Sequence, residues 1–350
     1  MNVMQHMTRF LLLLAESGFI PDSLIKIAVR YISSRRLIES THSNNKDEII
    51  SALSKGAVAE KTYDANEQHY EVPPEFFNQV LGSNLKYSCS LFDNDHSLDE
   101  AENSMLKLYL ERAEIKDGQD VLDLGCGWGS FSFFVAKKYP NTNITSISNS
   151  NDQITYIKNE AQKRGLSNIK AIKMDVNNLD LDNHFDRIVS IEMFEHLRNY
   201  KSILKSLNKL LKPNGRLFIH IFCHKKLTYF YELKNNFDWM TKYFFQGGIM
   251  PSRDIFEYFE DELIIINQWN INGNNYSKTC KAWLNNHYKN KKKILEIYRK
   301  YYDKPKIWYN RWRIFFLSCD AFFALNNGKE YFVSHYLLKK SDKKVISTKS

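Results

Sequence analysis

The chain has 350 residues, of which 43% are hydrophobic and 25% are charged, a composition typical of a globular protein with one large core or two modest ones. The longest apolar run near its start, residues 10–14, is far shorter than the roughly 20 residues that cross a bilayer, and no secretory signal pattern surrounds it. The five cysteines have no C-x-x-C spacing, so we expect no metal site, no disulfide framework and a reducing, cytoplasmic compartment.

Lysine and arginine number 49 against 40 acidic residues, which gives a net charge of +9. The excess favours an anionic surface, so peripheral membrane contact stays open, although a well-solvated lysine-rich surface explains the charge equally well. Nucleic acid is not expected as a partner, because no basic module with interleaved aromatic residues is present. The sequence also leaves a homodimer open.

The chain begins with a run of expected helices. The spacing of apolar residues predicts helices over residues 7–17, 21–36 and 48–61, and residues 40–47 are polar enough for a linker. Together these elements define an N-terminal helical segment, residues 1–62.

Strands and helices alternate from residue 98 onward. The expected helices of this part are 98–113, 130–138, 151–164 and 201–211, and the expected strands are 120–123, 143–148, 169–173, 186–191 and 216–222. A separate helix is expected before it, at 75–81. Alternation at this spacing predicts a parallel sheet with helices on both faces, and so an α/β core at residues 98–222. Such sheets bind ligands at the carboxyl ends of their strands.

The pattern changes after residue 222. Strands at 262–266 and 331–338 flank helices at 278–302 and 308–325, and aromatic residues, 14% of the chain, concentrate in this part. Packed helices or an apolar substrate cavity would both explain the aromatic content. We therefore expect residues 63–340 to form one domain whose portion 223–340 is a helical substrate cap with the last strands, followed by a basic tail at 341–350.

The most informative stretch joins the first strand of this core to its helix. An apolar run ends on Asp123 and is followed by Gly125, Gly127 and Gly129. Glycines let the backbone approach a ligand closely, and the helix that follows turns its free amides into the same space. A nicotinamide fingerprint would have a third glycine at Ser130. The pattern D-x-G-x-G-x-G instead resembles the cofactor loop of class I S-adenosylmethionine (SAM) methyltransferases, and a turn that binds nothing is the alternative.

The loops after the second and third strands carry candidate cofactor contacts. Asn149 and Gln153 have amides that can both donate to and accept from ribose hydroxyls, although a helix cap at Ser150 explains part of this loop without a ligand. Asp175 could accept the exocyclic amine of adenine while the Val176 amide contacts the ring edge. The alternative for Asp175 is a common strand-terminal turn.

The strongest chemical cluster follows the fourth strand. Glu192, Glu195 and His196 would share one helix face if a helix starts here, because positions i, i+3 and i+4 lie together. A carboxylate can hold an ammonium group while histidine or glutamate takes its proton, which is general base catalysis. The alternative is a helical first turn with acids favoured by the helix dipole and an exposed histidine.

These features together resemble the cyclopropane-fatty-acyl-phospholipid synthase family, and more narrowly its coclaurine N-methyltransferase-like branch. The motifs that carry the resemblance are His69-Tyr70-x-Val-Pro-x-x-Phe, Tyr87-Ser-Cys89, Gly-Cys-Gly-Trp-Gly129, Glu192-Met-Phe-Glu-His196, Phe222-Cys-His-Lys225, Tyr243-Phe-Phe-x-Gly-Gly-x-Met-Pro251 and Asn326-Asn-Gly-Lys-Glu330. The resemblance implies a Rossmann-like fold with a mostly parallel seven-stranded sheet, and it covers residues 64 to 340.

The resemblance also implies roles for individual residues. SAM would contact Tyr87, Ser88, Asp123, Gly125, Gly127, Asn149, Gln153, Asp175 and Val176. The catalytic group of the N-methylating members maps to Glu192, Glu195 and His196. Residues 243–251 would line the acceptor pocket, so that Tyr243 and Phe244 contact the substrate, with ordinary core packing as the alternative. Cys89 and His220 would also lie near the substrate. We expect methyl transfer from SAM to a nitrogen of an amphipathic or aromatic amine.

Two other functions remain open. The first is methylation or cyclopropanation of an unsaturated acyl chain of a phospholipid, and the cyclopropanating enzymes resemble this chain at Cys89, Glu195 and His220, which hold a bicarbonate base in them. Arg198 stands where their pattern has glycine, and Glu192 replaces their small residue. The second is a SAM-binding module without turnover.

Overall fold

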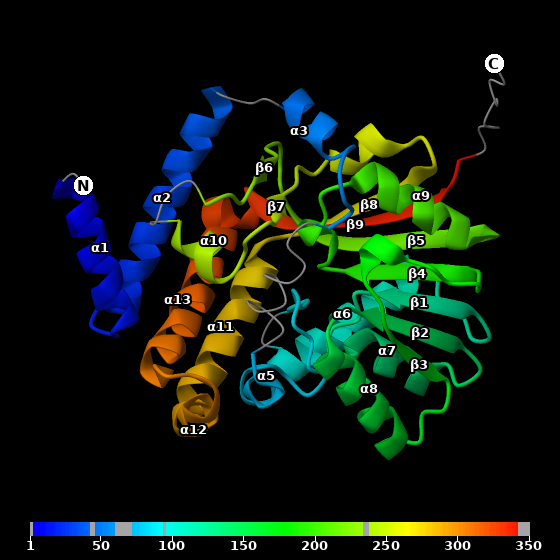
Figure 1. Cartoon of the computed structure of the whole chain (residues 1–350), viewed down its shortest axis with the longest axis horizontal. Coiled ribbons are helices and arrows are strands. Elements are labelled where there is room, and N and C mark those ends of the chain that lie inside the picture. The colour runs from blue at the N-terminus through cyan, green and yellow to red at the C-terminus, as the bar shows by residue number, and fades with distance from the viewer. Residues whose placement is uncertain (1–2, 43–45, 60–71, 94–95, 234–237, 342–350) are drawn as a thin grey trace.

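A computed structural model describes residues 3–42, 46–59, 72–93, 96–233 and 238–341 (Figure 1). Its centre is a seven-stranded sheet with the order β3-β2-β1-β4-β5-β9-β8. The strands are β1 (Asp120–Leu124), β2 (Asn143–Ser148), β3 (Ile169–Lys173), β4 (Phe185–Ile191), β5 (Leu211–His224), β8 (Leu263–Ile271) and β9 (Tyr331–Lys340). Neighbours from β3 to β5 are parallel, and β9 runs antiparallel to β5 and β8. This confirms the mostly parallel sheet that the sequence predicts.

The two faces of the sheet bury separate cores, because successive strand residues point to opposite sides. Val121 of β1 packs with buried residues of α6 (Leu98–Arg112) and α7 (Ser130–Lys138). Leu122 belongs to the other core, with α9 (Tyr200–Leu210) and the 3₁₀ segment η3 (Ile255–Phe259). A third cluster forms under α8 (Asn151–Lys163). The strands are therefore covered on both faces, as expected for a parallel sheet.

A helical layer lies beside the sheet in Figure 1. It consists of α5 (Pro74–Val80), α11 (Asn274–Lys289), α12 (Lys291–Tyr301) and α13 (Pro305–Phe323). Small elements join it to the sheet, namely β6 (Tyr229–Phe230), β7 (Ile249–Met250), α10 (Trp239–Tyr243) and the 3₁₀ segment η4 (Leu325–Gly328). The single helix predicted over 278–302 is wrong, since α11 ends at Lys289 and α12 begins at Lys291.

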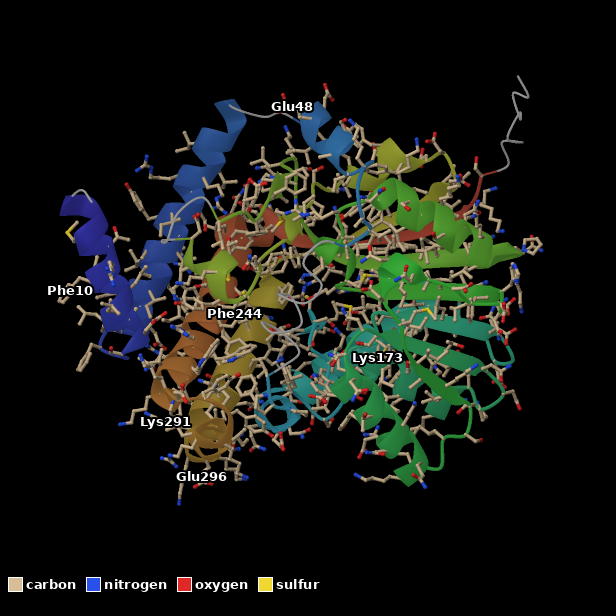
Figure 2. The ribbon with its side chains drawn as sticks, in the orientation of Figure 1. Phe10, Glu48, Lys173, Phe244, Lys291 and Glu296 are labelled. Atoms are coloured by element: carbon tan, nitrogen blue, oxygen red, sulfur yellow. The ribbon has the colours of Figure 1, made fainter. Side chains whose placement is uncertain are left out.

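The N-terminal helices α1 (Val3–Glu16) and α2 (Asp22–His42) stand against α13. Asp22 pairs with Arg313 at 2.5 Å, and Lys26 pairs with Asp320 at 2.5 Å. Such half-buried ion pairs fix one helix against another while contributing modest stability. Figure 2 shows Phe10 on the outer side of α1, where 60% of it is exposed.

Three N-terminal predictions need correction. The helix predicted over 21–36 continues to His42, so the predicted linker at 40–47 is partly helical. The helix predicted over 48–61 is α3 (Lys46–Ala52), and residues 53–59 form turns around Gly56. Residues 60–61, the His69-Tyr70 motif and most of the basic tail lie outside the described residues. Among the described residues, no helix is long and apolar enough to cross a membrane.

Gly273 lets α11 begin close to β9. A Cβ atom there would lie 2.1 Å from the carbonyl oxygen of Tyr331 and 2.5 Å from that of Phe323. We expect Gly273→Ala to lower the free energy of unfolding by about 1–3 kcal/mol, the usual cost of overpacking. Urea unfolding checks this, with Asn285→Ala on the exposed side of α11 as a control expected within about 0.5 kcal/mol of wild type. Equal stabilities for the two variants would contradict the close approach.

Candidate active site

The turn between β1 and α7 has three glycines in the left-handed backbone region, which favours glycine. The φ angles of Gly125, Gly127 and Gly129 are +80°, +52° and +80°. A Cβ on Gly125 would collide with Met193, and one on Gly129 with the side chain of Ile157. A Cβ on Gly127 would meet no atom within 4 Å. Two glycines therefore permit packing, and the middle one borders open space.

That space is a cavity of about 720 Å³ at the carboxyl ends of β1 and β4. Its wall brings together residues from α1, α2, the glycine loop, α11 and α13. Of the residues predicted from the sequence, it includes Tyr87, Ser88, Asp123, Gly125, Gly127, Gln153, Glu192 and His196. Trp128, Trp283, Phe315 and Phe323 add aromatic surface. An apolar pocket with a few convergent polar groups is the usual form of a small-molecule site.

The part of the cavity beside the glycine loop fits a polar ligand. The hydroxyl of Ser130 is buried at the start of α7 and has no hydrogen-bond partner among the described residues. A buried hydroxyl without a partner costs free energy unless a ligand supplies one. Asp123 behind it accepts a 2.6 Å hydrogen bond from Ser132, and burial raises its pKa to about 7. Open space at Gly127 and an unpaired hydroxyl at Ser130 suit a nucleoside.

The remaining predicted cofactor residues lie at the same edge of the sheet, outside the cavity wall. Asp175 lies two residues beyond the end of β3 and accepts the Asn177 backbone N–H at 2.8 Å, which starts the 3₁₀ segment η1 (Val176–Asn178). Ser150 caps α8 by accepting the Gln153 N–H at 3.4 Å, so the cap that the sequence suggests is present. Contacts of Asn149, Asp175 and Val176 with a ligand stay a prediction.

Glu192 directly follows β4 and is the centre of the site. No α-helix starts at the Glu192–His196 motif, which was the condition for a shared helix face, because Glu192 has a φ of +48° and only the 3₁₀ segment η2 (Phe194–His196) follows. The left-handed region is unfavourable for glutamate, and strain of this kind concentrates at functional sites. The backbone N–H of Glu192 donates to the His220 carbonyl at 2.8 Å, which fixes this geometry.

The carboxylate of Glu192 accepts hydrogen bonds from three separate segments. The Cys89 backbone N–H (2.8 Å) and His220 Nε2 (3.0 Å) reach its Oε1, and the Tyr276 hydroxyl reaches its Oε2 at 2.5 Å. Burial raises the pKa of Glu192, while the Cys89 N–H, the charge of Lys86 and the Tyr276 hydroxyl oppose the rise. Several donors on one carboxylate favour the anion.

Glu195 differs from Glu192 in its surroundings. It is fully buried away from the cavity wall, where its Oε1 accepts the Phe222 N–H at 3.2 Å. Its Oε2 has no hydrogen-bond partner among the described residues. Burial and the negative charge of Glu192 raise the pKa of Glu195 well above its ordinary value. Of two neighbouring carboxyls, Glu195 is therefore the neutral one and Glu192 the anion.

His196 lines the cavity with its ring 5.0 Å from that of Phe245. Burial lowers the pKa of His196 to about 4, against an opposing contribution from Glu192. The imidazole is consequently neutral at pH 7 and has a lone pair with which to accept a proton.

The predicted substrate residues do not line the cavity. Cys89 and His220 lie behind Glu192, which they hold through a backbone N–H and a ring nitrogen. Phe244, labelled in Figure 2, is fully buried. Its ring stacks on that of Phe315 with 4.5 Å between the centroids, which is the core-packing alternative. Tyr243 accepts a hydrogen bond from Arg311 at 3.1 Å. A direct substrate contact of these four side chains stays a prediction.

Sequence reasoning missed Tyr276 and Lys86. Tyr276 lies 84 residues beyond Glu192, and no local motif connects them. Lys86 precedes the Tyr87-Ser88 motif and is buried, with its ammonium 2.6 Å from Ser88 Oγ. Burial lowers its pKa to about 8, against the opposing charge of Glu192. Among the described residues, no group of histidine, cysteine and acidic side chains could hold a metal ion.

Comparisons with known proteins agree with this geometry. The family model of mycolic acid cyclopropane synthetase (CMAS) matches residues 58–331. The chain is 38% identical over 338 residues to (S)-coclaurine N-methyltransferase of Thalictrum flavum subsp. glaucum, covering 93% of this chain and 94% of that protein. A crystal structure of coclaurine N-methyltransferase bound to N-methylheliamine and SAH has a TM-score of 0.89 and 36% identity, covering 94% of this chain and 99% of that one.

A more distant relative is the cyclopropane-fatty-acyl-phospholipid synthase of Escherichia coli K12, 30% identical over 220 residues, which are 62% of this chain and 54% of that protein. The fold and the site define a SAM-dependent methyltransferase, and SAM is its methyl donor. The chain belongs to the mycolic acid cyclopropane synthetase family.

The open space at Gly127 gives a binding prediction. Gly127→Ala would place a methyl group where the ligand lies, so we expect the Kd for S-adenosylhomocysteine (SAH) to rise by roughly 10-fold or more. Gly165→Ala is a matched control, because Gly165 also has a positive φ (+67°) and open surroundings but lies outside the cavity wall. Calorimetry with SAH measures both. Equal Kd values for the two variants would argue against a ligand at the glycine loop.

Proposed function

We propose that the protein transfers a methyl group from SAM to the nitrogen of an amphipathic or aromatic amine. The observation that carries this proposal is a hydrogen-bonded carboxylate, Glu192, facing an aromatic cavity that also contains the neutral imidazole of His196. Relatives that are N-methyltransferases by name support the amine acceptor, and one crystal structure contains an N-methylated amine, N-methylheliamine.

The glycine-loop side of the cavity would hold the cofactor. The backbone at Gly125 and Gly127 permits close approach, and Tyr87, Ser88 and Gln153 supply polar groups from the wall. Asn149, Asp175 and Val176, at the ends of β2 and β3, would complete the ribose and adenine contacts. When bound, SAM supplies an electrophilic methyl group on a sulfonium centre.

Glu192 would bind the acceptor as an ammonium ion. An aliphatic amine has a pKa near that of lysine, roughly 10.4, so the neutral form at pH 7 costs about 4–5 kcal/mol. A carboxylate in a low-dielectric cavity attracts the ammonium group strongly and fixes the position of its nitrogen. The three donors on Glu192 keep the carboxylate from rotating away.

His196 would take the proton from the acceptor nitrogen on a ring nitrogen, which frees the lone pair for attack. Its neutral state at pH 7 makes this transfer available without prior deprotonation of the ring. Glu195 would remain protonated behind the cavity wall, so that Glu192 and Glu195 together carry one negative charge rather than two. The proposal thus separates an anionic anchor, Glu192, from a neutral base, His196.

One observation bears on the lipid alternative. The resemblance assigns Cys89 and His220 to a bicarbonate base in cyclopropanating enzymes, but here both donate to Oε1 of Glu192. The donors for bicarbonate are therefore already taken by a side-chain carboxylate. Amine methylation is the better-supported function, and bicarbonate is not needed for it.

The exposed surface of α1 and α2 supports a further contact. Of the described residues, these two helices and the turn between them provide most of the large exposed apolar side chains, namely Met7, Phe10, Leu11, Leu13, Phe19, Leu24, Ile27, Tyr31, Ile32 and Ile38. Exposed apolar patches of this kind mark membrane or protein contacts. We therefore keep peripheral membrane contact and a homodimer as proposals, and five free thiols fit a cytoplasmic location.

Substitution of the two neighbouring carboxyls separates their roles. We expect Glu192→Gln to lower kcat by roughly 100-fold or more, because the anionic anchor is lost. Glu195→Gln replaces a neutral acid with a neutral amide of the same shape, so kcat should stay within about 10-fold of wild type. Radiolabelled methyl transfer to a panel of secondary and tertiary amines provides kcat, and calorimetry with SAH should give an unchanged Kd for both. Wild-type turnover in Glu192→Gln would refute the anchor.

The pH dependence should follow the acceptor rather than His196. The pKa of His196 lies at about 4 in the folded chain, below its ordinary value of 6.5, so the neutral base is lost only in the pH window around 4. Above that window we expect kcat/KM to rise with pH until the acceptor ammonium has titrated. For two amines whose pKa values differ by about two units, the rising limbs of the two kcat/KM profiles should lie about two pH units apart. A common limb for both amines would point instead to a titrating group of the enzyme.

A further inference from the structure

Hydrogen bonds continue from Glu192 into the interior, away from the cavity. His220 of β5 donates or accepts at both ring nitrogens, with Nε2 3.0 Å from Glu192 Oε1 and Nδ1 2.9 Å from Nε2 of His335. His335 belongs to β9 and is the direct cross-strand partner of His220. Its Nδ1 lies 2.8 Å from Nη1 of Arg112, in the last turn of α6. Both histidines are fully buried.

Arg112, His335, His220 and Glu192 thus form a linear array of three hydrogen bonds. The chemistry of the two end groups, Arg112 and Glu192, fixes the direction of every hydrogen bond in this array. A guanidinium has donors only, so Arg112 donates to His335 Nδ1, which must carry a lone pair. A neutral His335 then has its hydrogen on Nε2 and donates to Nδ1 of His220. His220 in turn has its hydrogen on Nε2 and donates to Glu192. All three bonds point towards the carboxylate, whose anionic form accepts without any rearrangement.

The surroundings keep both rings neutral. Burial lowers the pKa of His220 and of His335 well below the ordinary value of 6.5, and the cations Lys86 and Arg112 lower both further. Arg112 keeps its own charge at every physiological pH. It reaches the protein surface beside Trp269 of β8, with its guanidinium 5.0 Å from the ring centroid.

Other ionisable groups also face this array. The Tyr109 hydroxyl of α6 lies 2.9 Å from His220 Nδ1, the nitrogen that His335 also contacts, and so acts as a second donor there. Lys86, His196 and Tyr276 face Glu192 from the cavity wall, and the buried Cys89 and Glu195 adjoin it behind that wall. We refer to these five residues as the cavity-side groups. None of these cavity-side groups belongs to the array that begins at Arg112, so a change at Arg112 or His335 reaches Glu192 through His220.

We propose that Arg112 and His335 are positioning residues for the reaction, which act through His220 to hold Glu192 ionised and correctly oriented. This inference rests on the proposed function. The array transmits the polarisation of the Arg112 cation through the neutral imidazoles of His335 and His220. It cannot carry a proton outward, because the guanidinium at its outer end does not deprotonate. The proton released from the acceptor therefore leaves on the cavity side, at His196.

The sign of the effect follows from the direction of the bonds. Loss of a donor that stabilises the anion raises the pKa of Glu192. Below the pH range in which the acceptor titrates, kcat/KM should fall more steeply where Glu192 becomes protonated, and this second acid limb should move to higher pH. The expected displacement is roughly one pH unit in His335→Phe and in Arg112→Met. His335→Gln restores a donor at the position of Nε2, and Arg112→Lys restores the cation and a donor, so both should return the limb most of the way to wild type.

The variants are compared on one amine that the wild-type enzyme methylates, across pH 5 to 10, with SAH affinity as a check on the cofactor site. Ser334→Ala is the matched control, because Ser334 neighbours His335 on β9 and is buried, yet contacts Cys223 and Asn270 on the opposite face. The inference predicts displaced limbs in His335→Phe and Arg112→Met and none in Ser334→Ala. Unchanged limbs in both folded variants would overturn it.

A second readout does not depend on turnover. The ¹³C shift of the Glu192 carboxyl, assigned with Glu192→Gln, reports its titration in wild type and in Arg112→Met. Long-range ¹H–¹⁵N spectra report the tautomers of His220 and His335, which should both be the Nε2–H form at pH 7. If no amine is methylated but the Glu192 pKa rises in Arg112→Met, the proposed function fails and the positioning role stands. An Nδ1–H tautomer of His335 or an unmoved Glu192 titration would overturn the positioning role itself.

Discussion

The structure depends on one buried negative charge at the end of β4. Removing a carboxylate from water costs several kcal/mol unless hydrogen bonds and a counter-charge replace its hydration. Glu192 obtains these from parts of the chain far apart in sequence, namely the loop at Cys89, strand β5 at His220 and helix α11 at Tyr276. The ammonium of Lys86 adds a buried positive charge nearby. The site is therefore assembled by tertiary structure before any substrate arrives, which is the preorganisation that catalysis in a dry cavity requires.

The same constraint ties the helical layer to the sheet. Tyr276 sits in the first turn of α11, and that helix starts at Gly273, whose backbone approaches Tyr331 of β9. Strand β9 also carries His335, which pairs with His220 on β5. A displacement of α11 or β9 would consequently remove a donor from the carboxylate. Helix α11, strand β9 and the Glu192 carboxylate are thus joined by direct contacts, while the glycine loop on β1 belongs to the parallel part of the sheet.

Local sequence patterns predicted the parallel core well and the site only in part. Strands 143–148 and 169–173 have the predicted bounds, because short isoleucine-containing segments with apolar and polar residues interleaved are typical of strands. The shared helix face considered for Glu192, Glu195 and His196 does not form, because spacing alone cannot reveal a left-handed residue that tertiary hydrogen bonds hold in place. The sequence did not predict that His335 and Tyr276 belong to the site, for another reason. Their proximity to Glu192 arises from the antiparallel return of β9 and the position of α11, contacts that no short motif encodes.

Residue 192 also connects the branches of this family. The resemblance to the cyclopropanating enzymes implies that a small residue stands here in them and that a bicarbonate ion supplies their base. In this chain the side chain of Glu192 reaches the donors on Cys89 and His220, so a covalently attached carboxylate occupies the position of a diffusible anion. Attachment removes the entropy cost of binding that anion, and it places a permanent charge where an ammonium ion is attracted. An alkene offers no charge in its ground state for that carboxylate to recognise. Under the proposed function, the charge fixed at the end of β4 would therefore favour an amine over an alkene acceptor.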